Sequence, residues 1–361
     1  MRILHLIYDH PQNPWVGGGG AVRAWEVCRR LASSGHDITM LCGAYPGASD
    51  RTEDRIDLRF IGSGSSYRKS TFSYAFKAAG FLRGHGSEFD IVVEDFAPWN
   101  PVFTTLMTRI PSVLHINHRE GTNILKRFSV AGLPFFLIEM FYHRMFRNVA
   151  SLSEGTRERI GRPDAFLHPA GINTELYEQG LDGVSDNERL IAYVGRLEIN
   201  NKGLDTLMKA MPKINNARLA MAGKGRDESE LVRMAQGLPV DFLGFVSEEE
   251  KHALLKRASL LVLPSRFEGW GIVTLEAAAC AKPVVVSDIP ELGYATVAGF
   301  GCAFRTGDAG GLADAVNYLL DNPEACNEMG TRAREFASKH TWDRIADEFE
   351  QYLKGIIKAD N

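Results

Sequence analysis

Short runs of apolar residues alternate along the chain with longer stretches in which apolar residues recur every three or four positions. The short runs are typical of buried β-strands and the longer stretches of helices that cover a sheet, so the pattern predicts an α/β fold with parallel sheets. In the first half we expect strands at 3–8, 37–42, 58–61, 91–94, 112–117, 149–152 and 165–167, and a helix at 21–33.

The same alternation begins again after a polar stretch, 173–188, which separates the two halves. In the second half we expect strands at 190–194, 218–221, 240–243, 260–263 and 284–287, and helices at 204–211, 248–258 and 273–279. The closing stretch 341–357 has its apolar residues at helical spacing. The chain therefore reads as two doubly wound, Rossmann-like domains in tandem, followed by a helix.

Composition narrows the class of protein. A length of 361 residues suits two domains, and 45% hydrophobic with 24% charged residues is typical of a soluble globular protein. A net charge of −4 argues against nucleic acid as a partner, and five cysteines without C-x-x-C spacing indicate reduced thiols. The longest apolar stretch, 133–142, is too short to span a bilayer, so we expect a cytoplasmic protein.

Basic residues are concentrated in two stretches of the first half. The stretch 59–87 holds five lysines and arginines and no acidic residue, and 119–147 holds five against Glu120 and Glu139, together with several phenylalanines. A basic, aromatic-rich surface can lie against anionic lipid. A solvated face over an ordinary core-packing helix explains the same pattern, so both interpretations stay open.

Three motifs point to chemistry. The first is the glycine run Gly17–Gly20, between the first strand and the first helix, where backbone N–H groups can approach an anion closely. It matches neither G-x-G-x-x-G nor a P-loop, and a flexible turn is the alternative.

The second motif is V-G-R at 194–196, followed by K-G at 202–203. Arg196 and Lys202 flank one strand-to-helix loop, at the sheet edge where open α/β sheets bind ligands. A guanidinium and an ammonium there suit a diphosphate, although two solvated loop cations are the simpler alternative.

The third motif is P-S-R-F-E-G-W-G-I-V-T-L-E at 264–276. It places Glu268 in a glycine-rich loop and Glu276 inside an otherwise apolar helix, where a carboxylate needs a partner. That partner is a ribose diol or a structural ion pair. Gly269 and Gly271 leave backbone N–H groups free at the start of the helix for an anion or a sugar hydroxyl.

With A-G-K-G at 222–225 and P-V-V-V-S-D at 283–288, these motifs occur in an order that resembles the retaining glycosyltransferases of family 4. The resemblance covers nearly the whole chain and is densest in the second half. It implies the GT-B fold: an acceptor-binding domain at 1–170, a nucleotide-sugar-binding domain at 171–341 and an interdomain cleft. It also implies a C-terminal helix, 342–361, that packs back on the first domain.

The resemblance further implies roles for single residues. Arg196 and Lys202 would hold the donor diphosphate, Glu268 would contact the transferred sugar, and Glu276 would hold the ribose. The expected backbone contacts with the donor are Gly195, Gly269, Trp270, Gly271 and Ile272, with Gly18, Gly19 and Gly20 closing over the phosphates from the first domain.

One position departs from the family pattern. Where many members carry a histidine at the end of the strand 112–117, this chain has Asn117, and His118 follows it. Because some relatives have a histidine pair at these two places, His118 is our candidate for a catalytic residue, ahead of His115.

The resulting expectation is a retaining transfer of a sugar from a nucleotide-diphosphate sugar to a hydroxyl of a glycan, a glycolipid or a small molecule. We expect neither a metal nor another cofactor, since the sequence has no D-x-D motif and the two cations can take the place of an ion. An anionic membrane surface is a further expected partner, which would place the protein peripherally on the inner face of the cell membrane.

Three other functions stay open. A sugar phosphorylase or a nucleotide-sugar epimerase would use the same fold. A non-catalytic paralogue would bind the nucleotide-sugar without turning it over. A dehydrogenase is disfavoured, because neither half has G-x-G-x-x-G after its first strand with an acidic residue about twenty positions on.

Overall fold

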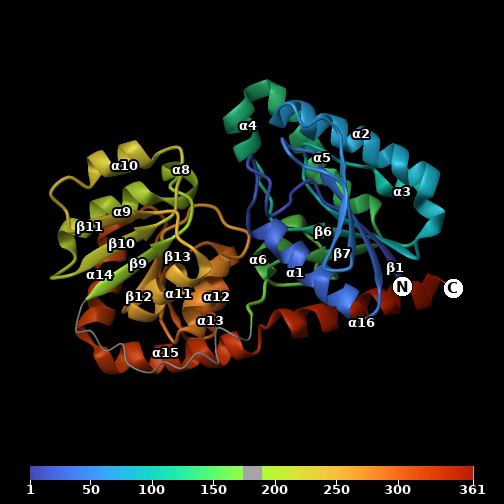
Figure 1. Cartoon of the computed structure of the whole chain (residues 1–361). Coiled ribbons are helices and arrows are strands. Elements are labelled where there is room, and N and C mark those ends of the chain that lie inside the picture. The colour runs from blue at the N-terminus through green and yellow to red at the C-terminus, as the bar shows by residue number, and fades with distance from the viewer. Residues whose placement is uncertain (174–188, 361) are drawn as a thin grey trace. The chain divides into compact units, whose positions relative to one another are not determined.

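The computed structural model describes residues 1–173 and 189–360, and the chain divides into two compact units (Figure 1). The first unit is Met1–Ala170 together with the C-terminal helix α16 (Trp342–Asp360), and the second is Gly171–Thr341. Except for Asn173, the polar stretch 173–188 lies outside the described residues. Each unit is a Rossmann-like sheet with helices packed on it, so the predicted fold class is confirmed.

The first unit is built on an eight-stranded sheet with the order β3-β4-β2-β1-β5-β6-β7-β8. Neighbouring strands are parallel except for the antiparallel pair β3 and β4. The strands are β1 (Arg2–Leu6), β2 (Asp37–Gly43), β3 (Arg51–Glu53), β4 (Ile56–Ile61), β5 (Ile91–Asp95), β6 (Ser112–Ile116), β7 (Asn148–Ser151) and β8 (Phe166–Leu167). The helices are α1 (Gly19–Ser33), α2 (Tyr67–His85), α3 (Thr104–Met107), α4 (Asn123–Phe128), α5 (Leu133–Phe141), α6 (Glu154–Ile160) and α16.

The strand order of this sheet reverses between β1 and β5. Loops that leave the carboxyl ends of these two strands therefore border a crevice, which is where open α/β sheets hold ligands. The strands form because their apolar residues are buried on both faces of the sheet. Leu4, Leu41 and Val92 lie in the core beneath α2, and the alternate residues Ile3 and Ile91, which point to the other face, are buried as well.

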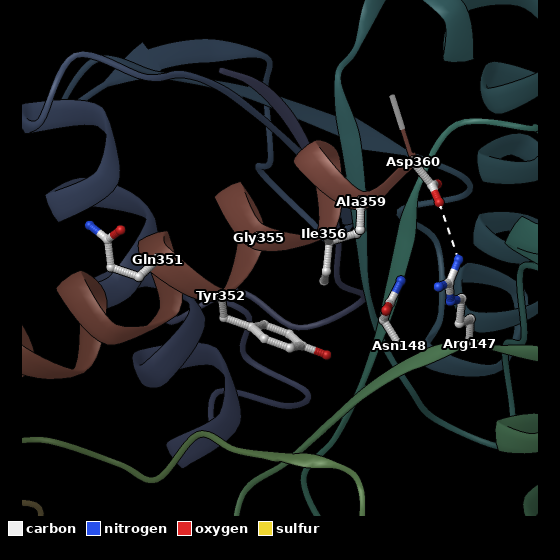
Figure 2. A pocket seen from close by; sticks show the side chains of 8 residues that line it. All are labelled: Arg147, Asn148, Gln351, Tyr352, Gly355, Ile356, Ala359 and Asp360. Carbon is white, nitrogen blue, oxygen red and sulfur yellow. Dashed lines mark hydrogen bonds and ion pairs between the residues drawn. The ribbon is translucent and has the colours of Figure 1, made fainter.

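Helix α16 packs on the first unit, as predicted for the C-terminal helix. It lies beside α1 (Figure 1), where Arg30 of α1 pairs with Asp343 of α16. The buried ring of Phe349 stacks on His168 with a centroid distance of 4.1 Å. Between α16 and the start of β7 lies a small pocket of about 260 Å³, beside the ion pair of Arg147 and Asp360 (Figure 2).

The second unit is built on a six-stranded parallel sheet with the order β11-β10-β9-β12-β13-β14. The strands are β9 (Leu190–Val194), β10 (Arg218–Ala222), β11 (Val240–Gly244), β12 (Leu260–Leu263), β13 (Val284–Ser287) and β14 (Gly301–Phe304). The helices are α8 (Ile199–Lys202), α9 (Leu204–Ala210), α10 (Glu228–Met234), α11 (Glu248–Arg257), α12 (Ile272–Ala279), α13 (Gly293–Val297), α14 (Ala309–Asp321) and α15 (Pro323–Ser338). Its strand order reverses between β9 and β12.

The structure adds elements that the pattern of the sequence did not predict, chiefly α2, α14, α15 and β14. It also corrects the glycine run. Gly19 and Gly20 form the first turn of α1 with Gly18 at its N-cap, so only Gly17 and Gly18 precede the helix. The anion-binding geometry expected there is therefore that of a helix N-terminus rather than of a four-glycine loop.

Candidate donor and acceptor sites

In the second unit, the loops after β9, β10 and β12 come together at the carboxyl edge of the sheet, beside its switch point. A Cβ atom on Gly223, after β10, would lie 1.9 Å from the carbonyl oxygen of Gly195, after β9. A Cβ atom on Gly203 would lie 2.1 Å from the carbonyl oxygen of Pro264, after β12. Only glycine allows these backbones to approach so closely, and so the motifs meet in one place.

Lys202 and Glu268 form the centre of this site. The Nζ atom of Lys202 lies 2.5 Å from Oε1 of Glu268, and the hydroxyl of Ser265 donates to the same oxygen at 2.8 Å. The side chains of Lys202 and Glu268 are only 15% and 10% exposed. Lys202 and Glu268 thus form a largely buried charged pair at the carboxyl edge of the sheet.

Arg266 fixes the loop that carries Glu268. Its backbone N–H donates to the carbonyl oxygen of Asn201 at 2.9 Å, and its guanidinium forms an ion pair of 2.7 Å with Asp205 of α9. These bonds tie the loop after β12 to helices α8 and α9, and so they hold Glu268 against Lys202. Arg266 and Ser265 lie inside the motif at 264–276, but the sequence did not mark them as positioning residues.

Arg196 lies apart from this pair. Its side chain is 67% exposed, and its Nη1 atom lies 3.5 Å from Oε1 of Glu198. The hydroxyl of Tyr193 donates to the backbone carbonyl of Arg196 at 2.8 Å and so fixes the loop, while the guanidinium extends toward solvent.

Glu276 lies inside α12, as predicted, and forms an ion pair with Lys251 of α11 at 2.8 Å. Lys251 also contacts Glu248 at 2.7 Å. Burial raises the pKa of Glu276, and Lys251 opposes that rise. Burial lowers the pKa of Lys251, but the two glutamates outweigh it and raise that pKa. Of the two partners that the sequence left open, the structure contains the ion pair, and Lys251 is the residue that sequence reasoning missed.

The start of α12 supplies the predicted backbone groups. Gly271 is the N-cap with a φ of 76°, which a residue with a side chain rarely adopts, and Ile272 is the first helical residue. Gly269 is half-buried in the loop before it. Trp270 is 5% exposed and stacks on Tyr294 with a centroid distance of 4.2 Å, so its ring packs inside the second unit.

In the first unit, the start of α1 meets the end of β6. A Cβ atom on Gly20 would lie 3.1 Å from Nδ2 of Asn117. The same Nδ2 atom donates to Oδ1 of Asp95 at 3.1 Å, which fixes the side chain of Asn117 beneath the helix N-terminus.

Asp95 is the centre of a buried charged cluster. It pairs with Arg23, with His5 at 2.5 Å and with His115 at 3.5 Å. Burial lowers the pKa of His5, but Cys28 and Asp95 outweigh it and raise that pKa to about 9. Burial and Arg23 lower the pKa of His115 to about 4, so its ring is neutral at pH 7.

The two histidines that the sequence singled out differ in exposure. His115 is fully buried in the cluster around Asp95. The side chain of His118 is 41% exposed, and its Nε2 atom lies 4.0 Å from Oε1 of Glu120. Of the two, His118 is therefore the one that a ligand can reach.

Comparison with known proteins follows the division into two units. Residues 17–176 match the family model Glycosyltransferase Family 4, and residues 182–336 match the model Glycosyl transferases group 1. The chain is 27% identical to the glycogen synthase of Mycobacterium tuberculosis (strain H37Rv), over 96% of this chain and 92% of that protein.

Two solved structures share the fold. The sucrose-phosphate synthase from Thermosynechococcus elongatus has a TM-score of 0.82 and 19% identity, with 99% of this chain and 100% of that chain covered. Anabaena HepE, in complex with UDP and glucose, has a TM-score of 0.75 and 16% identity, with 98% and 100% covered.

Proposed function

The chain belongs to the glycosyltransferases of the family 4 and group 1 type, with the GT-B fold, and we propose that it transfers a sugar from a nucleotide-diphosphate sugar to an acceptor hydroxyl with retained configuration. The observation that carries the proposal is the pair of Lys202 and Glu268 with Ser265 at the switch point of the second unit. The complex of Anabaena HepE with UDP and glucose supports a nucleotide-sugar as the donor.

In this proposal Lys202 changes partner when the donor binds. Without the donor, its ammonium neutralises Glu268. A diphosphate attracts the ammonium and the exposed guanidinium of Arg196, and it leaves the Glu268 carboxylate free to accept hydrogen bonds from the hydroxyls of the sugar. The two cations stabilise the charge that develops on the leaving diphosphate, so the reaction needs no metal ion or other cofactor.

Glu276 holds the ribose in the same proposal. A ribose diol has two O–H donors, and a carboxylate accepts both with its two oxygens. Lys251 pairs with Glu276 at 2.8 Å and opposes the rise that burial causes in the pKa of Glu276, which favours the carboxylate form that the diol needs. The backbone N–H groups near Gly269, Gly271 and Ile272 would contact the donor, with Gly195 beside the diphosphate and Trp270 packed behind the loop.

The first unit binds the acceptor in this proposal. The positive N-terminus of α1 at Gly18, Gly19 and Gly20 suits a phosphate, and His118 is accessible to a sugar or acceptor hydroxyl. The acceptor is a saccharide or a lipid-linked molecule, and the protein works in the cytoplasm at an anionic membrane surface. The anomeric configuration is retained when the acceptor hydroxyl attacks the same face of the sugar from which the diphosphate departs. The leaving phosphate then assists removal of the proton from that hydroxyl.

The test measures release of nucleoside diphosphate from a panel of nucleotide-sugars, with the anomeric configuration of the product read by proton NMR. We expect an α-linked product, and we expect Lys202→Ala and Glu276→Ala each to lose most of the activity while they stay folded. Lys209→Ala is the matched control, because Lys209 also pairs with an acidic residue, Asp205, but is 64% exposed on α9. Wild-type rates in both site variants would refute the assignment.

The same assay separates the other functions. A requirement for inorganic phosphate would indicate a phosphorylase, and a free epimerised nucleotide-sugar an epimerase. Tight nucleotide binding without turnover on any acceptor would indicate a non-catalytic paralogue.

A further inference from the structure

The first unit contains a groove of about 510 Å³ between α2, the segment 99–107 and α5. Its walls are mainly apolar and include five aromatic residues, with Phe72 and Phe76 on one side and Trp99, Phe103 and Phe135 on the other. Arg83 is the one charged residue among those that line it. The volume lies within the range of small-molecule sites, and the lining suits an apolar ligand rather than a sugar.

The wall formed by the segment 99–107 is held firmly. Phe103 has a φ of 56°, which is unfavourable for a residue with a side chain. Its backbone N–H donates to the hydroxyl of Tyr142 at 2.6 Å, and that hydroxyl in turn donates to the buried carboxylate of Glu94 at 2.7 Å. Thr104 donates to Glu94 at 2.5 Å. These bonds maintain the strained backbone, so the groove does not depend on the loose packing of surface side chains.

In helix α5 the pattern of burial is the reverse of that in an ordinary surface helix, since its acidic residue is buried and several apolar residues are exposed. Among its nine residues, all of them described, Glu139 alone is buried, and it accepts hydrogen bonds of 2.7 Å from the backbone N–H groups of Glu120 and Gly121. Leu137 and Phe141 are nearly half exposed, while Phe76 of α2 is 80% exposed. Ile138 of α5 packs against the core of the first unit, so the core-packing interpretation describes that residue but not the exposed Leu137 and Phe141. Apolar surface of this kind marks a binding site for an apolar partner.

The charge around the groove is positive. Helix α2 has no acidic residue and carries Arg68, Lys69, Lys77 and Arg83. Arg144 lies over the ring of Phe141 at 5.0 Å. A second copy of the chain joined by a two-fold axis would bring the same basic face against itself, which disfavours a dimer here. An anionic partner with an apolar part fits both features.

We propose that this groove holds the hydrocarbon chain of an anionic membrane lipid and that the acceptor of the proposed reaction is such a lipid. The second half of this statement rests on the proposed function. No helix in the described part of the chain is long and apolar enough to cross a membrane. The lipid chain is drawn from the bilayer between Phe76 and Trp99, while the basic residues of α2 contact the anionic headgroups.

The test uses phosphatidylglycerol vesicles whose acyl chains carry bromine, which quenches tryptophan fluorescence only at contact. We expect quenching in the full-length protein, and we expect Trp99→Phe to remove most of it because Trp99 lines the groove. Vesicles of brominated phosphatidylcholine, which carry no net charge, should bind and quench far less.

Two glycine variants distinguish vesicle binding through the groove from binding through the rest of the surface. Gly80 of α2 lines the groove and a Cβ atom there meets nothing within 4 Å, so Gly80→Leu fills the groove and favours the helix. Gly355→Leu is the matched control, since Gly355 is also helical, is equally open, and lines the pocket of Figure 2. Gly80→Leu should weaken vesicle binding about fourfold for each methylene that it keeps out, and Gly355→Leu should leave binding unchanged.

The proposal would be overturned if the protein bound vesicles without quenching of its tryptophan fluorescence. It would also be overturned if Gly80→Leu were quenched as strongly as the wild type, or if the wild type bound the phosphatidylglycerol and phosphatidylcholine vesicles equally. Calorimetry with nucleoside diphosphates on the same proteins keeps the two proposals apart. If nucleotide binds and the acyl chain does not, only the groove assignment fails. If the acyl chain binds and no nucleotide does, the proposed transferase function fails instead.

Discussion

Replacement of Lys251 by methionine tests the environment of Glu276. In the structure Nζ of Lys251 lies 2.8 Å from Oε1 of Glu276, and each side chain is 16% exposed. At an effective dielectric constant of about 20, charges at that distance attract by about 6 kcal/mol. Solvent at the exposed edge and the lost desolvation cost of Lys251 offset part of this, so we expect Lys251→Met to destabilise the protein by about 3 kcal/mol at pH 8.

The loss depends on pH in a direction that the structure fixes. In Lys251→Met burial acts on Glu276 without an opposing cation, so the folded-state pKa of Glu276 rises further above its unfolded value of about 4.3. A group whose pKa is higher in the folded than in the unfolded state contributes stability that is fully present below its unfolded-state pKa. That stability is lost as pH rises through its folded-state pKa. The variant should therefore differ little from wild type near pH 5 and most at pH 8.

Urea unfolding followed by circular dichroism at pH 5 and pH 8 measures this difference. The double variant Lys251→Met with Glu276→Gln should lose the added pH dependence, because the ionisable group is gone. If Lys251→Met is as stable as wild type at pH 8, or is destabilised equally at both pH values, the ion pair does not control the ionisation of Glu276.

Three further predictions follow from single contacts. Gly223→Ala should weaken nucleotide binding at least about tenfold and destabilise the protein by about 1–3 kcal/mol, because its Cβ would lie 1.9 Å from the carbonyl oxygen of Gly195; calorimetry and urea unfolding measure both effects. Asp95→Asn should lower the pKa of His5 from about 9, although Cys28 still raises it, and should reduce the stability that the wild type loses as pH rises from about 6.5 to 9. NMR titration of His5 measures the pKa, and an unchanged value would show that Asp95 does not hold the proton on His5. Phe349→Ala should cost about 3–5 kcal/mol because that ring is 1% exposed, and a loss below about 1 kcal/mol would show that α16 adds little to the first unit.

The doubly wound fold could be predicted because strands buried on both faces are continuous apolar runs, as at Leu190–Val194 and Leu260–Leu263. Helix α2 could not, because its apolar residues lie on two sides. Tyr74, Ala78 and Leu82 face the core, while Phe72 and Phe76 face the groove, and the second set destroys the periodicity that marks an amphipathic helix.

The candidate donor site divides in the same way. Lys202 and Glu268 could be found because each lies in a loop that follows a strand, and parallel strands bring such loops to one edge. Lys251 could not, because a lysine after Glu248, Glu249 and Glu250 reads as a solvated charge run. Its contact with Glu276 depends on how α11 packs against α12, and the pattern of residues within either helix carries no information about that packing.

Calorimetric titration of nucleoside diphosphates tests the central claim most directly. The account predicts that at least one binds the wild-type protein and that Lys202→Ala weakens this binding at least about tenfold, the loss of one charge-assisted contact to phosphate. Lys209→Ala should bind as the wild type does. Absence of binding by every nucleoside diphosphate, or equal affinity in Lys202→Ala and wild type, would contradict the assignment of a donor diphosphate site to the second unit.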